Sequence, residues 1–328
     1  MPVHSYTLDV DTLIATTIAA RAEFWQDNIF DEYPTQKKLT EMKETRDGGH
    51  RIECPLEYYA TETGKALASD LETIVLAEPD PGTYAFYPWA TVADGINLAK
   101  NKISDNNGKQ KILDYVDFLL DNFERRIVAL KSTFAWAATP AARDPNSIPS
   151  FISTVGTGTV GNIVSGTSTW WKNQFKSSGA FATVGMADIR KLYNDCSKGQ
   201  NSLMPDWIVT DQSGFENFEA HMSARERLNL DSDGRKKQTV GYERLFYKRA
   251  EVVWDDDISS VSTTTDGRWY FLNTKFIKYV CEKGRWFDRG PLLQARDQLG
   301  KSMLIDSRYN MVTDGRRHLG VLSSVTYP

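Results

Sequence analysis

Three glycines in GTGTVGNIVSGTSTWW, residues 156–171, have a spacing that can serve cofactor binding. Gly156, Gly158 and Gly161 spell G-x-G-x-x-G, which lets a backbone approach a dinucleotide pyrophosphate. That chemistry also requires a helix that begins at the third glycine and an acidic residue about 20 positions further on. The residues after Gly161 are poor helix formers, and the next acidic residue is Asp188. The context therefore favours a flexible connecting loop over a dinucleotide site.

Patterns for metal binding and nucleophilic catalysis are also incomplete. DSDG at 231–234 resembles the start of a calcium loop, but Lys236 and Tyr242 occupy the positions that need Gly and Glu. The acidic run 255–257 follows a strand and is interpreted as a solvated turn rather than an ion site. The motifs G-x-S-x-G, S-x-x-K and H-E-x-x-H are absent, and the few His and Cys residues are scattered. We therefore predict no catalytic, cofactor-binding or metal-ligating residue, and no cofactor.

The adjacent pair Trp170 and Trp171 is the more informative part of the glycine-rich stretch. Two neighbouring side chains cannot both point into one core layer, on a strand or on a helix. One indole is thus expected to face another element or another chain, and aromatic side chains are favoured anchors of interfaces. Burial of both indoles within one domain stays open as the alternative.

The composition sets limits on the class of protein. The chain has 328 residues, enough for two or three core-bearing units, with 41% hydrophobic and 25% charged residues. Its formal net charge of −4 argues against a broad basic surface for binding nucleic acid. The N-terminal residues do not resemble a signal peptide, and the apolar stretches are too short to cross a bilayer. We expect a reducing, cytosol-like compartment and no membrane partner.

The order of expected elements is mixed α+β. Apolar residues at three- and four-residue steps predict a helix over residues 109–137, about 40 Å long. A short helix is expected around 94–102, and further helices over 184–199 and 211–228. Asp211 or Ser213 is the expected N-cap of the last of these. A buried strand is expected over 205–210, and strands alternate with turns in most of the remaining C-terminal half.

Two N-terminal segments lack the apolar residues for a core of their own. Residues 1–47 combine a thin helical pattern, which includes Phe24 and Trp25, with a charged tail. Residues 50–60 alternate with period two, residues 61–70 form a loop that carries Lys65, and residues 71–82 are expected to return as a second strand. Residues 48–83 therefore predict a hairpin. Because isolated hairpins are only marginally stable in water, we expect both segments to lie against other parts of the chain or against another subunit.

Four stretches, taken in order, resemble the major capsid proteins of tailed bacteriophages, which have the Hong Kong-type fold. The place of that family's extended E-loop hairpin is taken here by HRIECPLEYYA, and the place of its spine helix by KQKILDYVDFLLDNFERRIVALKSTF. One branch of the family has a Gly/Thr-rich run like TVGTGTVGNIVSGTSTWWKNQF. The same branch has a closing strand like DGRRHLGVLSSVTYP. The likeness covers nearly the whole chain.

The resemblance implies an α+β fold with four parts: an N-terminal arm (1–47), an E-loop hairpin (48–83), a peripheral domain (84–155 and 265–328) and a mainly axial domain (156–264). It implies a structural, non-enzymatic role in the virion. Copies would assemble in the host bacterial cytoplasm into hexamers and pentamers of an icosahedral shell around packaged double-stranded DNA. Implied partners are further copies, a portal, decoration proteins and a separate scaffolding protein, unless a scaffolding segment has been removed.

Under this resemblance the candidate subunit contacts are Trp170, Trp171, Lys65, Phe24 and Trp25. Some members cross-link an E-loop lysine to an asparagine of a neighbour, but nothing in the sequence identifies a partner for Lys65, so no cross-link is predicted. Two alternatives stay open. One is the shell protein of a bacterial nanocompartment of the same fold, and the other is a cytosolic nucleotide-dependent enzyme that uses the 156–161 loop.

Overall fold

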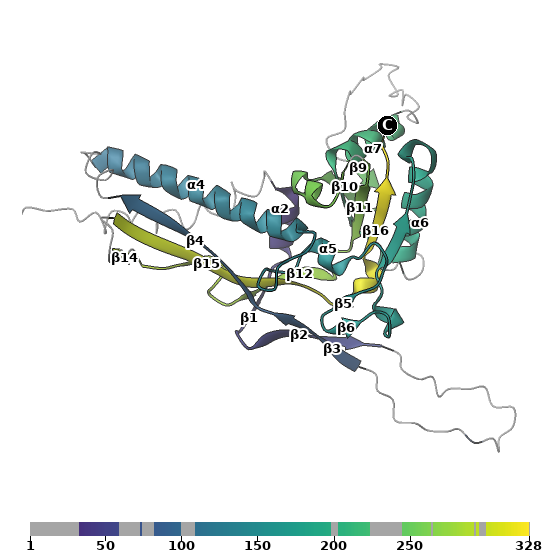
Figure 1. Cartoon of the computed structure of the whole chain (residues 1–328), viewed down its shortest axis with the longest axis horizontal. Helices are drawn as coiled ribbons and strands as arrows, with labels where there is room; N and C mark the ends of the chain where they lie inside the picture. The colour runs from purple at the N-terminus through teal and green to yellow at the C-terminus, as the bar shows by residue number, and fades with distance from the viewer. Residues whose placement is uncertain are drawn as a thin grey trace, which may run out of the picture.

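The computed structural model describes residues 33–58, 73, 82–99, 109–197, 203–223, 245–263, 265–291, 293–294 and 300–327. These residues form two six-stranded sheets, one long two-stranded hairpin and one very short hairpin. The two sheets lie side by side, and the long hairpin lies below the place where they meet in the view of Figure 1. The architecture is the mixed α+β one predicted from the sequence.

The first sheet is organised around one long strand, β15. Its strands are β1 (Glu44–Arg46), β12 (Ile277–Glu282), β15 (Gly300–Thr313) and β13 (Asp288–Arg289) in order of pairing, with β14 (Leu293–Gln294) and β4 (Ala90–Ala99) also paired to β15. β4 runs antiparallel to β15 along its whole length. The short helix expected around 94–102 is therefore wrong. Gly95 and Asn97 are poor helix formers, and a partner strand 200 residues away leaves no local signal.

Helix α4 (Lys109–Trp136) covers one face of the first sheet, and helix α2 (Pro34–Glu41) contacts it (Figure 1). The long helix is thus confirmed within one residue of the predicted end. Arg126 on α4 forms an ion pair with Asp94 on β4 at 2.7 Å, which joins helix and sheet near the periphery. Phe123 and Ile127 are buried where the three- and four-residue pattern places them, and the polar side chains of Lys131 and Ser132 on the same helix are buried as well.

The C-terminal end of α4 is fixed to an acidic turn. Trp136 is buried and donates its Nε1–H to Oδ2 of Asp255 and to Oγ1 of Thr35, both at 3.3 Å. Asp255 also caps the short 3₁₀ helix η4 (Asp256–Ser260) by accepting from the backbone N–H of Asp257 at 3.1 Å. The interpretation of 255–257 as a solvated turn is therefore wrong for Asp255, whose carboxylate is buried by its indole partner.

The second sheet has helices α6 (Met186–Cys196) and α7 (Gln212–Ser223) packed on it. Its strands, in spatial order, are β7 (Gln174–Ser177), β16 (Gly320–Val325), β11 (Gly267–Leu272), β8 (Trp207–Thr210), β10 (Ala250–Trp254) and β9 (Leu245–Tyr247). The buried strand expected over 205–210 is confirmed as β8. The side chain of Asp211 accepts from the N–H of Gly214 and caps α7, as its position predicts.

The pairing of β11 and β16 differs from the predicted domain division. All of residues 265–328 were assigned to the peripheral part, and β12 and β15 do lie in the first sheet. β11 and β16, however, pair in the second sheet, and a 3₁₀ turn η5 (Arg316–His318) lies between β15 and β16. The division into arm, hairpin, peripheral and axial parts otherwise stays a prediction.

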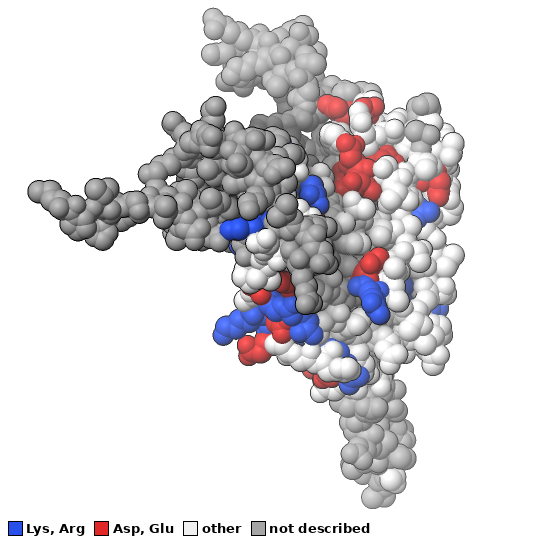
Figure 2. All heavy atoms as spheres, turned by 60° about the vertical axis from the view of Figure 1, so that its left-hand side comes forward, with Lys and Arg blue, Asp and Glu red and all other residues white. Residues whose placement is uncertain are grey.

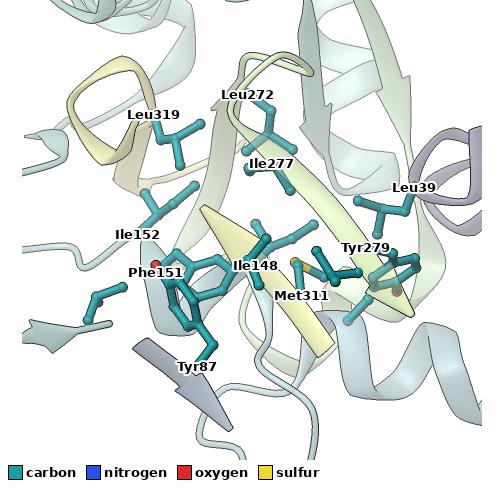
Figure 3. Packing of buried hydrophobic residues seen from close by; sticks show 14 of the residues in the cluster. Leu39, Tyr87, Ile148, Phe151, Ile152, Leu272, Ile277, Tyr279, Met311 and Leu319 are labelled. Carbon is teal, nitrogen blue, oxygen red and sulfur yellow. The ribbon is translucent and has the colours of Figure 1, made fainter. Parts of the chain in front are cut away.

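One hydrophobic cluster joins both sheets to the long hairpin. Its side chains come from α2, from the hairpin, from the short helix α5 (Ile148–Phe151) and from both sheets. Figure 3 shows Tyr87 beside Phe151, with Ile148 and Met311 next to them. A second cluster fills the space between the second sheet and helices α6 and α7. Among the described helices, none is both long enough and apolar enough to span a bilayer.

Candidate functional site

The glycine-rich run 156–171, here called the GW loop, folds into a tight hairpin. Strands β5 (Thr159–Val160) and β6 (Ile163–Val164) pair antiparallel, and Gly161 and Asn162 between them have φ values of +60° and +64°. Two central residues with positive φ define the turn that matches the right-handed twist of paired strands. A strand therefore follows the third glycine, where a dinucleotide site needs a helix.

The glycines also allow the GW loop to approach its neighbours closely. A Cβ on Gly161 would lie 2.7 Å from Cβ of Ala85 and 3.0 Å from Oη of Tyr87, both on the long hairpin. The carbonyl of Gly161 accepts from the N–H of Phe86 at 3.0 Å. A Cβ on Gly156 would lie 2.6 Å from the ring of Phe175 on β7. The expectation of a slack connection is therefore incomplete, because the loop makes specific contacts with the hairpin.

Replacing Gly161 with alanine is expected to lower the free energy of unfolding by about 2 kcal/mol. The new Cβ would collide with Ala85, and the alanine backbone would have to adopt a positive φ that is strained for residues other than glycine. The midpoint of urea unfolding, followed by far-ultraviolet circular dichroism, measures this change. Gly166→Ala is the control, because its nearest neighbour, Val164 Cγ1, lies at 3.8 Å. Equal midpoints for both variants would contradict the close approach of loop and hairpin.

Trp171 closes the GW loop onto itself. The residue ends a single 3₁₀ turn, η2 (Thr169–Trp171), and its side chain is only 2% exposed. Its Nε1–H donates to the carbonyl of Val160 at 3.0 Å, which fixes the indole to the tip of the small hairpin. Trp171 therefore packs within its own chain.

Arg316 joins helix α5 to both ends of this loop. The side chain is 1% exposed, and its guanidinium donates to the carbonyls of Phe151 (2.6 Å), Thr157 (3.3 Å) and Trp171 (3.4 Å). In the described part of the chain it has no ion-pair partner. Burial lowers the pKa of Arg316 to about 10, so the group stays charged at neutral pH. The GW loop, α5 and Arg316 together are called the junction below.

Trp170 points to the base of the long hairpin instead. Its half-buried indole stacks on the ring of Tyr58, with centroids 5.0 Å apart and planes 7° from parallel. Tyr58 directly follows strand β2 (Arg51–Glu57), which pairs with β3 (Gly82–Pro88) along its full length. The two adjacent tryptophans thus face different elements, as their adjacency predicts, and the second element is the hairpin.

The hairpin buries one face on the junction and exposes the other. Ile52, Cys54 and Leu56 of β2 point inward with Ala85 and Tyr87 of β3. On the outer face, Tyr84 is 54% exposed and its ring lies 6.4 Å from that of Phe86. The guanidinium of Arg51 lies 3.7 Å above the ring of Phe86. This outer face, defined by Arg51, Tyr84 and Phe86, is a candidate contact surface.

The sequence did not single out these three residues. The returning strand was expected over 71–82, whereas β3 begins at Gly82. A usable signal was present in its run GTYAFYP, where Tyr84 and Phe86 alternate with Ala85 and Tyr87. Of the predicted contact residues, Trp170 and Trp171 lie next to each other at the junction. Lys65, Phe24 and Trp25 lie outside the described residues, as does DSDG at 231–234. Within the described ranges no three His, Cys, Asp or Glu side chains gather closely enough to hold a metal ion.

Comparison with known proteins identifies the fold. No protein-family model matches the sequence, and no curated protein matches it. The structure does match the capsid asymmetric unit of cyanophage A-1(L), with a TM-score of 0.65 and 15% identity over 90% of this chain and 93% of that one. The capsid of an empty GTA particle matches with a TM-score of 0.56 and 13% identity, over 89% of this chain and 90% of that one. An encapsulin complex of Synechococcus elongatus matches with a TM-score of 0.53 and 10% identity, over 94% of this chain and 95% of that one.

These likenesses extend over nearly the full length of each chain. The protein therefore has the Hong Kong-type fold of tailed-phage major capsid proteins, as the four sequence stretches predicted. The long helix lies where the sequence placed the spine helix. Strand β2 lies in the stretch predicted as the E-loop hairpin, and its partner β3 begins at Gly82, where the predicted hairpin ends.

Proposed function

We propose that this chain is the major capsid protein of a tailed bacteriophage. Its copies assemble into hexamers and pentamers of an icosahedral head around packaged double-stranded DNA. The observation that carries this proposal is the match to the cyanophage A-1(L) capsid subunit over about nine tenths of both chains. Because the match covers about nine tenths of both chains, it supports a shell subunit with a structural rather than an enzymatic role.

The hairpin supports association with other copies. Its inner face is buried on the junction, whereas the outer face leaves Tyr84 and part of Phe86 in water. Covering apolar surface stabilises a complex by roughly 25 cal/mol per Å², before the costs of association are subtracted. We infer that a neighbouring subunit covers this face. Trp170, Lys65, Phe24 and Trp25 are proposed as further contacts between copies, and Trp171 as support for Trp170.

The distribution of charge supports enclosure of DNA without sequence-specific binding. On the face shown in Figure 2, the described Lys and Arg side chains lie beside Asp and Glu side chains rather than in one basic area. Arg308 pairs with Glu282 at 3.0 Å, and Lys278 pairs with Glu44 at 3.1 Å. Strong, salt-sensitive binding of purified subunits to duplex DNA would argue against this account. A scaffolding protein, a portal and decoration proteins are the further partners that the proposal includes, with assembly in the host cytoplasm.

A bacterial nanocompartment shell is the second candidate, because the encapsulin complex of Synechococcus elongatus also matches most of this chain. Its contents would be cargo proteins instead of DNA. The lower TM-score, 0.53 against 0.65, favours the phage head.

Electron microscopy of the purified full-length chain, alone and with its scaffolding protein, tests the proposal. Shells, tubes or capsomer rings are the expected products. Monomers or small oligomers that bind a nucleotide saturably would overturn the capsid function. Nuclease-protected DNA inside native particles supports a phage head, and co-purifying protein cargo without DNA supports the nanocompartment.

Tyr84→Ser is expected to lower the yield of assembled particles at least several-fold while leaving the urea midpoint of the subunit nearly unchanged. The reason is that Tyr84 is exposed in the single chain and proposed to be covered in the shell. Sedimentation of assembly reactions measures the yield. Val184→Ser, at another exposed apolar position near α6, is the matched control. Normal particle yield from Tyr84→Ser would exclude this face as a contact.

A further inference from the structure

Lys131 of α4 is buried among aromatic rings. Its side chain is 3% exposed, and Nζ lies 3.8 Å from the ring centroids of both Trp286 and Phe287. The ring of Tyr309 on β15 is 5.1 Å away. Among the residues that the structure describes, Nζ has no hydrogen-bond partner. The cage therefore offers the amine aromatic faces and no acceptor oxygen.

Such a cage disfavours the charged amine. An ammonium without an acceptor loses its hydration on burial, and contacts with ring faces replace only part of it. The groups around it do not compensate: Lys43, between α2 and β1, places its own Nζ 5.0 Å from the Trp286 ring. Burial and the charge of Lys43 hold the pKa of Lys131 well below its ordinary value, and Cys281 of β12 acts weakly in the opposite direction.

The carboxylates on the strands that carry Cys281 and Tyr309 are already engaged by arginines. Glu282 accepts from Arg285 and Arg308, and Asp306 accepts from Arg285. Neither carboxylate hydrogen-bonds to Lys131. Among the residues that the structure describes, a proton on Lys131 therefore has no hydrogen-bonded counter-charge while the cage is closed.

One wall of the cage is formed by a single segment at the protein surface. Trp286 and Phe287 are half-buried and lie on segment 283–291, which follows β12 and contains β13. The segment is held to β15 by backbone hydrogen bonds from Arg308 N to Arg285 O and from Gly290 N to Leu304 O, both 2.8 Å. Ser307 Oγ also donates to the carbonyl of Trp286. Outward movement of this one segment would give the amine access to water.

We propose that Lys131 makes segment 283–291 a proton-sensitive latch on the long helix. The uncharged amine lets the segment close over α4, and uptake of a proton releases the segment so that the ammonium reaches water. The inference concerns the single chain and does not depend on the proposed capsid function.

The direction of the pH dependence follows from this geometry. A lysine in the unfolded chain takes up its proton near pH 10.4, about the ordinary value, whereas the caged amine does so only at lower pH. Between those two values the unfolded state binds the proton and the folded state does not, so acidification favours unfolding. The unfolding equilibrium constant of the wild type, relative to Lys131→Met, should rise by up to about tenfold for each pH unit lowered in this window.

Two measurements on the full-length chain test the latch. Urea midpoints of wild type and Lys131→Met are compared from pH 6 to pH 10, with Lys191→Met, an exposed lysine on α6, as control. Hydrogen-exchange mass spectrometry then follows peptides that contain the amides of Gly290 and Arg308, with intrinsic rates corrected for pH. In the wild type and in Lys191→Met, protection of these amides should fall as pH decreases, and in Lys131→Met it should stay constant.

Parallel pH profiles for wild type and Lys131→Met would overturn the proposal. A Lys131-dependent midpoint with constant protection of segment 283–291 would also overturn it, since the lysine would then be buried without acting on the segment. If Lys131→Met does not fold, Lys131→Leu and Lys131→Gln are measured in the same way. Failure of all three uncharged variants to fold would contradict an amine that is uncharged in the closed state.

Discussion

Replacing Trp171 with alanine is expected to lower the free energy of unfolding of the subunit by about 3–5 kcal/mol. The change removes a fully buried indole from the junction and leaves a cavity between the GW loop and the hairpin. It also leaves the carbonyl of Val160 without its donor. Urea unfolding measured by far-ultraviolet circular dichroism gives the stability. Assembled particles should be lost in parallel, because the hairpin is no longer supported from below.

Trp170→Ala is the matched control. Its indole is half-buried and mainly contributes the stack on Tyr58, so the expected loss of stability is about 1 kcal/mol. Neither variant is expected to change nucleotide binding, since the GW loop is a hairpin and not a phosphate loop. Equal stability losses for the two variants would contradict the different burial of the two side chains.

Replacing Arg316 with methionine is expected to cost about 3 kcal/mol or more. Methionine fills much of the volume but donates nothing, so the carbonyls of Phe151, Thr157 and Trp171 lose a donor in a buried place. Each unsatisfied buried acceptor costs about 1–3 kcal/mol, reduced where the structure relaxes or water enters. The urea midpoint of the purified chain measures the loss.

The neighbouring arginine provides the control for this experiment. Arg317 is exposed, so Arg317→Met should change stability by no more than about 0.5 kcal/mol. Arg316→Lys should lie between the two, because a compact ammonium keeps the charge but cannot reach three separate carbonyls. If Arg316→Met is as stable as Arg317→Met, the guanidinium does not hold the junction together.

The sequence predicted elements whose pattern is local. The long helix follows from apolar residues at three- and four-residue steps, and Phe123 and Ile127 are buried where that pattern places them. β8 follows from a short apolar run, and the cap of α7 follows from Asp211. Each of these features depends on contacts within one turn or one strand, which neighbouring residues record.

Long-range pairing left no such record. Residues 90–99 have mixed local preferences, and only β15, far along the chain, makes them a strand. β11 and β16 read as ordinary strands, but the sheet that each one joins depends on partners from 174–177 and 207–210. Period-two alternation does not identify a partner strand, so the sequence alone did not separate these two strands from β12 and β15.

The candidate site shows the same limit. The T-W-W run and the R-R-H run were each noticed for their residue types, 145 positions apart. Their meeting through Arg316 and the carbonyl of Trp171 is a tertiary contact that neither run predicts alone. The glycines were misjudged as slack for a related reason: positive φ at Gly161 serves a turn, but the close approach of Ala85 is visible only in three dimensions.

The path of β15 into β16 affects how the chain can be made. β15 supplies partners to four strands of the first sheet, and after the turn at Arg316 the next strand, β16, lies between β7 and β11 of the second sheet. Neither sheet can therefore be completed on the ribosome until residues 300–325 have been synthesised, although most of the chain emerges earlier. A polypeptide that ends before residue 300 would lack β15 in the first sheet and β16 in the second. We therefore expect a chain that ends before residue 300 not to complete either sheet.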